Sequence, residues 1–366
     1  MIDTRIRYQP ATVTAPGETL ADLLEEQCMT QTELAHRMGR PVKTINEIIK
    51  GKAAITPETA LQLEKVFTTP AAYWLNHEAH YRAYLARRNE DDDLAAWHNW
   101  LDRHPLKELK TLDILPDLYS RGKNKNILLR RLLHFFGVAS PTEWENFYGN
   151  MKTAYRRNKD QSDPYATAAW LRLGELQAAS ASCAPFDRQR FDAALHEIRT
   201  FTLLPPEDFE PRLKALCAAT GVIVALVPAI PRARVSGAAR WLNNRPLIQL
   251  SLYGKTNDRF WFTFFHEACH ILKHSHKLVY LDELDGDPSE PEEQEADRFA
   301  ANLLIPPEYA AELPTLRSKE AVRTFAGHIG VHPGIVVGRL QHDNEIEKSW
   351  MNDLKATFTW RETPVG

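Results

Sequence analysis

His266-Glu267-Ala268-Cys269-His270 lies inside an apolar run, with Phe260-Trp261-Phe262-Thr263-Phe264-Phe265 before it and Ile271-Leu272 after it. Residues four apart share one face of an α-helix, so the two imidazoles can bind one metal ion. Glu267, next to the first imidazole, can then reach a water molecule at that ion. The pattern H-E-x-x-H is typical of zinc hydrolases, although two histidines and a glutamate also occur by chance on a partly buried helix.

A second helix is predicted downstream, and its carboxylates could complete the site. A catalytic zinc usually takes three protein ligands and leaves the fourth position to water. Apolar residues recur there with helical period until Pro306-Pro307, which ends the helix. Glu293 is the preferred third ligand because small residues line its face, with Glu295 the second choice and Glu292 the third. Asp297, one turn on, is placed to accept the free N–H of a ligating histidine. Each of these residues could instead be a surface carboxylate.

Two residues near the motif are expected to have other roles. His274 is four residues after His270 and about 12 Å along the helix axis from His266, so one ion cannot easily bind all three. His274 is therefore predicted to lie at the helix end without binding the metal. Cys269 points away from the ligand face and is expected to be a small buried hydrophobic residue.

Taken together, residues 266–270 and 293–306 resemble the ImmA/IrrE family of gluzincin-like metallopeptidases. The resemblance extends upstream through residues 237–251 and downstream to residues 334–341, and it covers about 206–366. It implies Zn²⁺ bound by His266, His270 and Glu293, with Glu267 as the general base. Relatives in this family cleave transcriptional repressors of bacteria and phages, or promote their loss. Cys269 is a departure, because relatives often carry glycine there.

Residues 17–67 carry a different pattern, a series of short amphipathic helices. Thr30-Gln31-Thr32-Glu33 has the form of a capping box, and the helix that it opens stops at Gly39. A helix with a buried isoleucine stripe follows within residues 41–51, and Thr56-Pro57-Glu58 opens another. Two short helices joined by a tight glycine-containing turn predict a helix-turn-helix motif.

The second helix of this motif is expected in the major groove of DNA. Four exposed residues are the candidates for contacts with base edges: Arg40, Lys43, Thr44 and Asn46. Gln31, Lys50 and Lys52 are better placed to contact phosphates. Residues 30–52 carry five basic and two acidic side chains, a modest positive charge in a chain of net charge −3. A helical bundle used only for dimerisation or protein contact is the alternative.

The segment from Tyr8 through Leu75 resembles the HigA branch of the Xre-type repressors, which are autorepressing antitoxins of toxin–antitoxin operons. This resemblance implies double-stranded operator DNA and a cognate toxin as partners. A homodimer is expected, because helix-turn-helix proteins usually bind two half-sites about 34 Å apart.

Composition limits the class of protein. With 366 residues, 43% of them hydrophobic and 25% charged, the chain is expected to form two or three soluble domains. No apolar run approaches 18 residues and no signal peptide is recognised, so no membrane association is expected. The four cysteines are scattered without C-x-x-C spacing, which indicates reduced thiols and a cytoplasmic protein.

The chain is therefore predicted to be α+β and mostly α, in three parts. A helix-turn-helix bundle is expected at 1–90, a helical middle region at 91–205 and a zincin-like domain at 206–366, with a small sheet that includes a hairpin turning at Asn243-Asn244. Basic residues of the middle region form either a second nucleic-acid surface or, as we favour, solvated helix faces: Lys123, Lys125, Arg130, Arg131, Arg156, Arg157 and Lys159.

Two functions are compatible with these patterns. One is a DNA-binding regulator or antitoxin with a zinc-dependent endopeptidase domain that cleaves a partner repressor, a toxin or itself. The other is a HigA-like antitoxin and autorepressor without proteolytic activity, whose zinc-site domain senses a signal or binds a partner.

Overall fold

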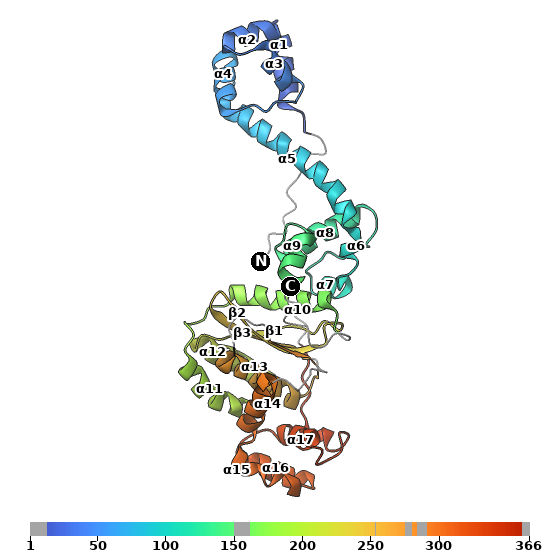
Figure 1. Cartoon of the computed structure of the whole chain (residues 1–366), viewed down its shortest axis with the longest axis vertical. Coiled ribbons are helices and arrows are strands. Elements are labelled where there is room, and N and C mark those ends of the chain that lie inside the picture. Colours follow the sequence, from blue (N-terminus) through green and yellow to red (C-terminus); the bar gives the residue numbers. More distant parts are fainter. Residues whose placement is uncertain (1–12, 150–161, 253, 275–279, 284–290, 361–366) are drawn as a thin grey trace. The chain divides into compact units, whose positions relative to one another are not determined.

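The computed structural model describes residues 13–149, 162–252, 254–274, 280–283 and 291–360. The chain divides into two compact units, residues 1–98 and residues 99–366. Figure 1 labels their helices and strands. The proposed division into three parts at residues 90 and 205 stays a prediction. Arg156, Arg157 and Lys159 of the basic group lie outside the described residues.

Residues 13–97 of the first unit form five helices: α1 (Pro16–Glu26), α2 (Gln31–Met38), α3 (Val42–Ile49), α4 (Pro57–Phe67) and α5 (Ala71–Ala96). Their apolar faces meet in one core that includes the fully buried Leu20, Leu34, Ile45, Leu63 and Trp74. The predicted helix starts are confirmed, because the side chains of Thr30 and Thr56 accept hydrogen bonds from backbone N–H groups in the first turns of α2 and α4. Helix α2 ends as expected at Gly39, which has φ of 64°.

The second unit begins with helices that precede its sheet. They are α6 (His98–Leu101, from the last residue of the first unit), α7 (Leu106–Thr111), α8 (Lys123–Phe136), α9 (Pro141–Trp144), a π-helix (Glu145–Gly149), α10 (Pro164–Ser180), α11 (Arg188–Thr200), a 3₁₀-helix (Phe201–Leu203) and α12 (Pro206–Ala219). The predicted helical character of the middle region is confirmed by α8, α10 and α11.

The sheet of the second unit is small and mixed. Its strands are β1 (Ile223–Leu226), β2 (Val235–Leu242), β3 (Arg245–Leu250) and β4 (Tyr280–Glu283), in the order β1-β3-β2-β4. Strand β1 runs parallel to β3, whereas β2 runs antiparallel to both β3 and β4. The predicted hairpin is confirmed, because Asn243 and Asn244, at φ of 49° and 65°, turn the chain between β2 and β3.

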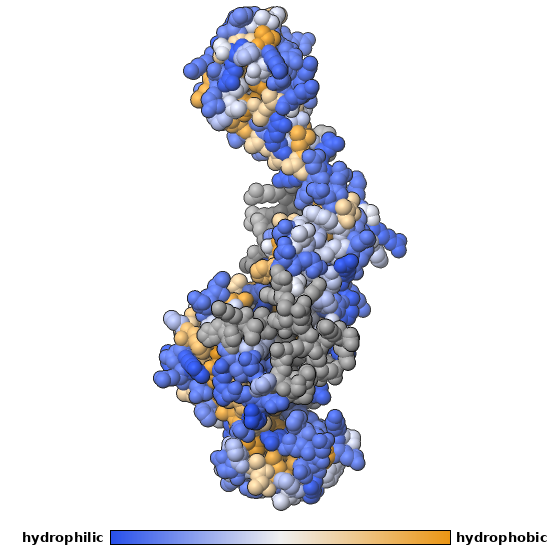
Figure 2. All heavy atoms as spheres, viewed as in Figure 1, coloured by the Kyte–Doolittle hydropathy of each residue, from blue (hydrophilic) through white to orange (hydrophobic). Residues whose placement is uncertain are grey.

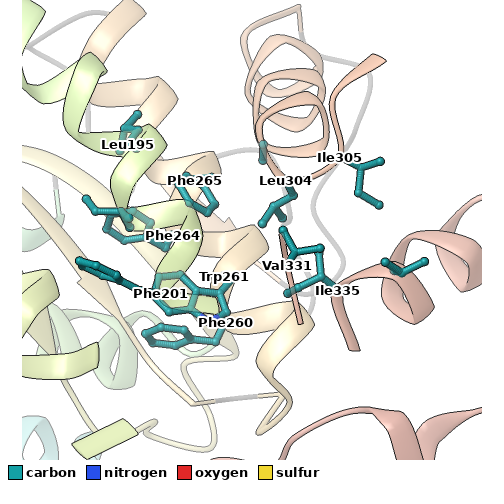
Figure 3. Packing of buried hydrophobic residues seen from close by; sticks show 14 of the residues in the cluster. Leu195, Phe201, Phe260, Trp261, Phe264, Phe265, Leu304, Ile305, Val331 and Ile335 are labelled. Atoms are coloured by element: carbon teal, nitrogen blue, oxygen red, sulfur yellow. The ribbon is translucent and has the colours of Figure 1, made fainter. Parts of the chain in front are cut away.

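The helices after β3 include the one that carries the H-E-x-x-H motif. They are α13 (Asn257–Lys273), α14 (Pro291–Leu304), α15 (Pro307–Ala310), a 3₁₀-helix (Leu313–Thr315), α16 (Lys319–Ile329), α17 (Pro333–His342) and a further 3₁₀-helix (Asn352–Leu354). Figure 3 shows the aromatic residues of α13 packed with Leu195 of α11 and Leu304 of α14. Because Phe191, Leu195 and Ile198 join this core, α11 belongs structurally with the sheet and α13.

These elements confirm a mostly helical α+β fold. Helix α13 is almost entirely buried, since all but three of its residues are buried: Arg259, Phe262 and Lys273. Figure 2 shows that hydrophilic side chains cover much of the visible surface of each unit. Among the described helices, none combines the length and apolarity needed to cross a membrane.

Candidate metal centre

Helices α13 and α14 bring two imidazoles and one carboxylate together. His266 and His270 are one turn apart on α13, and their Nε2 atoms are 3.0 Å apart. Oε2 of Glu293, on α14, lies 3.1 Å from Nε2 of His266, and its Oε1 lies 3.7 Å from Nε2 of His270. Within the described part of the chain, these three residues are the group of histidine, cysteine and acidic side chains close enough to hold a metal ion. We call them the imidazole–carboxylate cluster.

The tautomer of His266 explains why this cluster is suited to bind a cation. Its Nδ1 lies 2.9 Å from Oδ1 of Asp297, so Nδ1–H donates to that carboxylate. In the neutral ring, Nε2 then presents a lone pair to the carboxylate of Glu293, which also can only accept. A cation resolves this conflict. Tetrahedral zinc with bonds of about 2.0–2.1 Å separates its ligand atoms by about 3.3 Å, close to the spacing here.

The ionisation states also fit a metal site. Burial lowers the pKa of His270 to about 4, so at neutral pH the ring is neutral, as a ligand must be. Burial opposes ionisation of Glu293, but hydrogen bonds to His266 and His270 outweigh it and hold the pKa of this carboxyl well below its usual range. Both groups are therefore in the form that binds a divalent cation.

Glu267 follows His266 directly and is fully buried. Its side chain lies against β2 at Gly237. A Cβ atom at Gly237 would approach Oε1 of Glu267 to 2.6 Å and would come closer still to the side chain of Thr263. The missing side chain at Gly237 therefore makes the space that Glu267 occupies between α13 and the sheet.

Three further residues near the motif are not members of the imidazole–carboxylate cluster: Cys269, Glu295 and His274. Cys269 is buried, and burial raises its pKa to about 12, so it is a neutral thiol as expected. Glu295 does not join the cluster; it lies 2.9 Å from Nζ of Lys273 and 3.4 Å from Nε2 of His274. His274 ends α13, as the sequence predicts, and its ring also contacts His270.

Sequence reasoning missed the surroundings of His270. Its ring stacks on Tyr280 of β4, with centroids 4.1 Å apart, and its Nδ1 lies 2.8 Å from Nδ1 of His274. The spacing of four residues between the two histidines was a usable signal for their contact, because such residues are neighbours on a helix. No local pattern indicated Tyr280, since β4 pairs with a strand about 40 residues away.

A second buried polar group lies where α10 meets the sheet. The Arg240 guanidinium of β2 contacts Oε1 of Glu175 at 2.9 Å and donates to Oε1 of Gln249 on β3. Gln249 in turn donates to the backbone oxygen of Trp170, and Arg172 pairs with Glu175 at 2.8 Å. We call Arg240, Glu175, Gln249 and Arg172 the Arg240 cluster.

The candidate DNA contacts lie around α2 and α3 of the first unit. Lys43 and Lys50 are exposed, whereas Gln31, Arg40, Thr44 and Asn46 are partly buried. Nδ2 of Asn46 donates to Oε1 of Gln31 at 3.2 Å, which links the middle of α3 to the first residue of α2. Nε of Arg40 donates to Gln62 of α4, and Lys43 lies 3.8 Å from Glu47.

Comparison with known proteins assigns both regions. Residues 231–341, which contain β2, β3, α13 and α14, match the M78 peptidase family model described as the IrrE N-terminal-like domain. Residues 20–74 match the model described as Helix-turn-helix. The chain joins a helix-turn-helix domain to an IrrE N-terminal-like domain. The first of these domains resembles HigA antitoxins.

Individual relatives match the helix-turn-helix domain. Virulence-associated protein A of Dichelobacter nodosus is 39% identical over 59 residues, which are 16% of this chain and 58% of that protein. The uncharacterised HTH-type transcriptional regulator YddM of Escherichia coli is 34% identical over 61 residues, which are 17% of this chain and 65% of that protein. The chain thus spans about six-tenths of the length of these curated relatives.

Two solved structures are similar in the same region. An antidote protein of the HigA family from Coxiella burnetii is 30% identical, with 23% of this chain and 91% of that chain covered and a TM-score of 0.21. The antitoxin HigA of Pseudomonas aeruginosa, solved with its higBA promoter, is 25% identical, with 22% and 90% covered and a TM-score of 0.22.

Proposed function

We propose that this protein is a transcriptional regulator that binds operator DNA and carries a zinc-dependent endopeptidase acting on a regulatory protein. The substrate would be a partner repressor, a toxin or the chain itself, in the cytoplasm. The observation that carries the peptidase half is the convergence of His266, His270 and Glu293 beside the buried Glu267. The IrrE N-terminal-like match gives this geometry a hydrolytic context.

The roles follow from the chemistry of each side chain. His266, His270 and Glu293 would hold the metal, and Asp297 would fix the proton of His266 on Nδ1. Zn²⁺, when bound, supplies a Lewis acid that polarises the scissile carbonyl and acidifies water. Glu267 accepts a proton from the attacking water and delivers it to the leaving amine nitrogen as the C–N bond breaks. Glu267 is thereby returned to its starting state.

The test compares wild type with Glu267→Gln in the full chain. Both proteins should contain one equivalent of zinc by elemental mass spectrometry, because Glu267 is not among the proposed ligands. New protein N-termini, detected by N-terminal labelling in cells that produce the protein, should appear with wild type only.

Glu292→Gln is the matched control, since it changes a glutamate of α14 that contributes nothing to the cluster. This variant should retain both zinc and cleavage. If Glu267→Gln produced the same new N-termini as wild type, the proposed role of Glu267 would be wrong. If wild type bound no metal, the proposed peptidase function would fall as a whole.

The DNA-binding half of the proposal rests on the helix-turn-helix domain. Arg40, Lys43, Thr44 and Asn46 would contact base edges from α3 and the preceding turn. Gln31 and Lys50 would contact phosphates. A homodimer would present two such helices to half-sites about 34 Å apart.

A second candidate function is supported by the resemblance of the first domain to HigA antitoxins. The chain would then be an autorepressor that binds its partner without cutting it. Gel-shift titration of the chain's own promoter region, with and without a zinc chelator, together with N-terminal labelling, separates the two. Operator binding that ignores both chelation and Glu267→Gln, with no new N-termini from wild type, would favour this second function.

A further inference from the structure

A series of polar side-chain contacts runs from His270 through His274 to Glu295. Nδ1 of His270 lies 2.8 Å from Nδ1 of His274, and Nε2 of His274 lies 3.4 Å from Oε2 of Glu295. The side chain of His274 is only 5% exposed, although it ends its helix. The imidazole of His274 is therefore shielded from solvent beside His270, whereas the neighbouring Lys273 side chain is exposed.

The protons in this series of contacts can be assigned from the direction of each lone pair. His270 turns Nε2 toward the imidazole–carboxylate cluster, so its single proton belongs on Nδ1 when that lone pair is used for a metal. Nδ1–H of His270 then donates to Nδ1 of His274. The proton of His274 consequently lies on Nε2, which faces the carboxylate of Glu295. Each contact has one donor and one acceptor.

We propose that His274, backed by Glu295, is a positioning residue that fixes the tautomer and the ring orientation of His270 for metal binding. This inference rests on the proposed metal site and extends it to the groups behind one ligand. His266 is held directly by a carboxylate, that of Asp297, whereas His270 is held through a second imidazole. Tyr280 packs against the face of the His270 ring and leaves its edge to His274.

The test measures metal affinity and does not depend on cleavage. Zn²⁺ dissociation constants of the full chain, from competition with a chromophoric chelator, are compared for wild type and His274→Ala. Loss of an outer partner of a metal-binding histidine typically weakens affinity about 10–100-fold, and we expect a loss in this range. In the Co²⁺-loaded protein, the visible d–d bands should shift, because the His270 ring is no longer held in one orientation.

Conservative replacement distinguishes positioning from simple packing. His274→Gln supplies an amide oxygen that can accept from His270 and an N–H₂ group that can donate to Glu295. It should recover much of the affinity and the Co²⁺ spectrum that His274→Ala loses. Circular dichroism of the metal-free proteins establishes that each variant is folded.

Lys273→Met is the matched control. It removes the other partner of Glu295, whose salt bridge to Lys273 is 2.9 Å long, without touching either histidine. Its zinc affinity should equal that of wild type, and Glu295→Ala should weaken affinity less than His274→Ala does.

Two outcomes would overturn the inference: wild-type zinc affinity in a folded His274→Ala protein, or no recovery in His274→Gln relative to alanine. Failure of the proposed metal site is a different result, because wild type itself would then bind neither Zn²⁺ nor Co²⁺.

Discussion

The imidazole–carboxylate cluster and the Arg240 cluster are both polar and largely shielded from solvent, but they differ in whether the protein itself supplies the positive charge. In the Arg240 cluster the protein supplies both signs, the guanidinium of Arg240 and the carboxylate of Glu175. In the imidazole–carboxylate cluster, acceptor atoms of His266, His270 and Glu293 converge. The first arrangement pairs its positive and negative charges without a ligand, whereas the second calls for a cation. Buried polar groups thus contribute to stability in one place and to binding in the other.

The largest expected effect on stability comes from removing the positive charge of Arg240 from the Arg240 cluster. Arg240→Met removes a side chain that is 1% exposed and takes one of two cationic partners from the carboxylate of Glu175, which keeps its contacts with Arg172 and the Tyr148 hydroxyl. Breaking a buried ion pair from one side costs about 3–5 kcal/mol, and we expect a loss of this order in urea denaturation followed by circular dichroism.

Arg245→Met, on the neighbouring strand, is the control. Arg245 is partly exposed and makes one long contact to the backbone oxygen of Ala181, so its loss should be far smaller. Equal losses in the two variants would show that the Arg240 cluster contributes no more than an ordinary surface arginine.

The next effect tests whether the other cluster depends on a cation. Zn²⁺ at one hundred times its dissociation constant should stabilise wild type by about 2.7 kcal/mol, because it binds the folded chain only. His266→Ala should abolish this increment, as measured by denaturation with zinc and with chelator. His196→Ala, at an exposed position of α11, should keep it. An increment unchanged in His266→Ala would place the stabilising metal elsewhere.

Another buried imidazole, that of His104, extends the comparison because aromatic rings surround it instead of carboxylates. It packs against Trp100, Phe136, Trp144 and Tyr165, and its Nδ1 lies 3.0 Å from the Trp100 backbone oxygen. Burial lowers its pKa to about 3. The unfolded chain, with a pKa of about 6.5, takes up the proton first as the pH falls. The stability contributed by neutral His104 is therefore full above pH of about 6.5 and is lost on the way down to about 3.

Between pH 7 and pH 5, this linkage should lower the free energy of unfolding by about 2 kcal/mol. The measurement is urea denaturation at both pH values in the presence of chelator. His104→Asn keeps a donor for the Trp100 backbone oxygen but does not titrate in this range, so its loss should be smaller by that amount. Identical pH dependence in the two proteins would mean that His104 is not the group responsible.

The smallest effect concerns a matched charge pair in solvent. Lys319 and Asp353 are 2.8 Å apart, with side chains 48% and 58% exposed. Water screens such pairs, so Lys319→Gln should change stability far less than Arg240→Met does in the same denaturation assay. A loss comparable to that of Arg240→Met would remove the distinction between buried and exposed pairs.

Features encoded over a few residues could be predicted from the sequence. The capping residues Thr30 and Thr56 set the starts of α2 and α4, and the Asn243-Asn244 turn set the hairpin, because each depends on local backbone geometry. The approach of Glu293 to the two histidines was also accessible, since the small residues on its face of α14 predict close contact with another helix.

Features that depend on distant partners could not be predicted in this way. Glu175 and Arg240 are 65 residues apart, and the sequence around neither residue predicts the contact with the other. The short strand β4 exists because it pairs with β2, and α11 joins the core of the second unit only through its packing. For His274, helix spacing indicates only that the ring is too far from His266 to bind the same ion. It does not by itself indicate the hydrogen bond between the His274 and His270 rings.

Strand β2 contacts Glu267 of α13 from one face and carries Arg240 of the Arg240 cluster on the other. Gly237 faces Glu267 of α13, and Arg240 faces Glu175 of α10. Successive residues of a strand point to opposite sides, so these two assignments require an odd number of steps between positions 237 and 240. Deleting one residue between them would make the spacing even and turn the guanidinium toward Glu267 and α13. Parity along this strand, and not only the identity of its residues, is therefore a condition that the chain must satisfy.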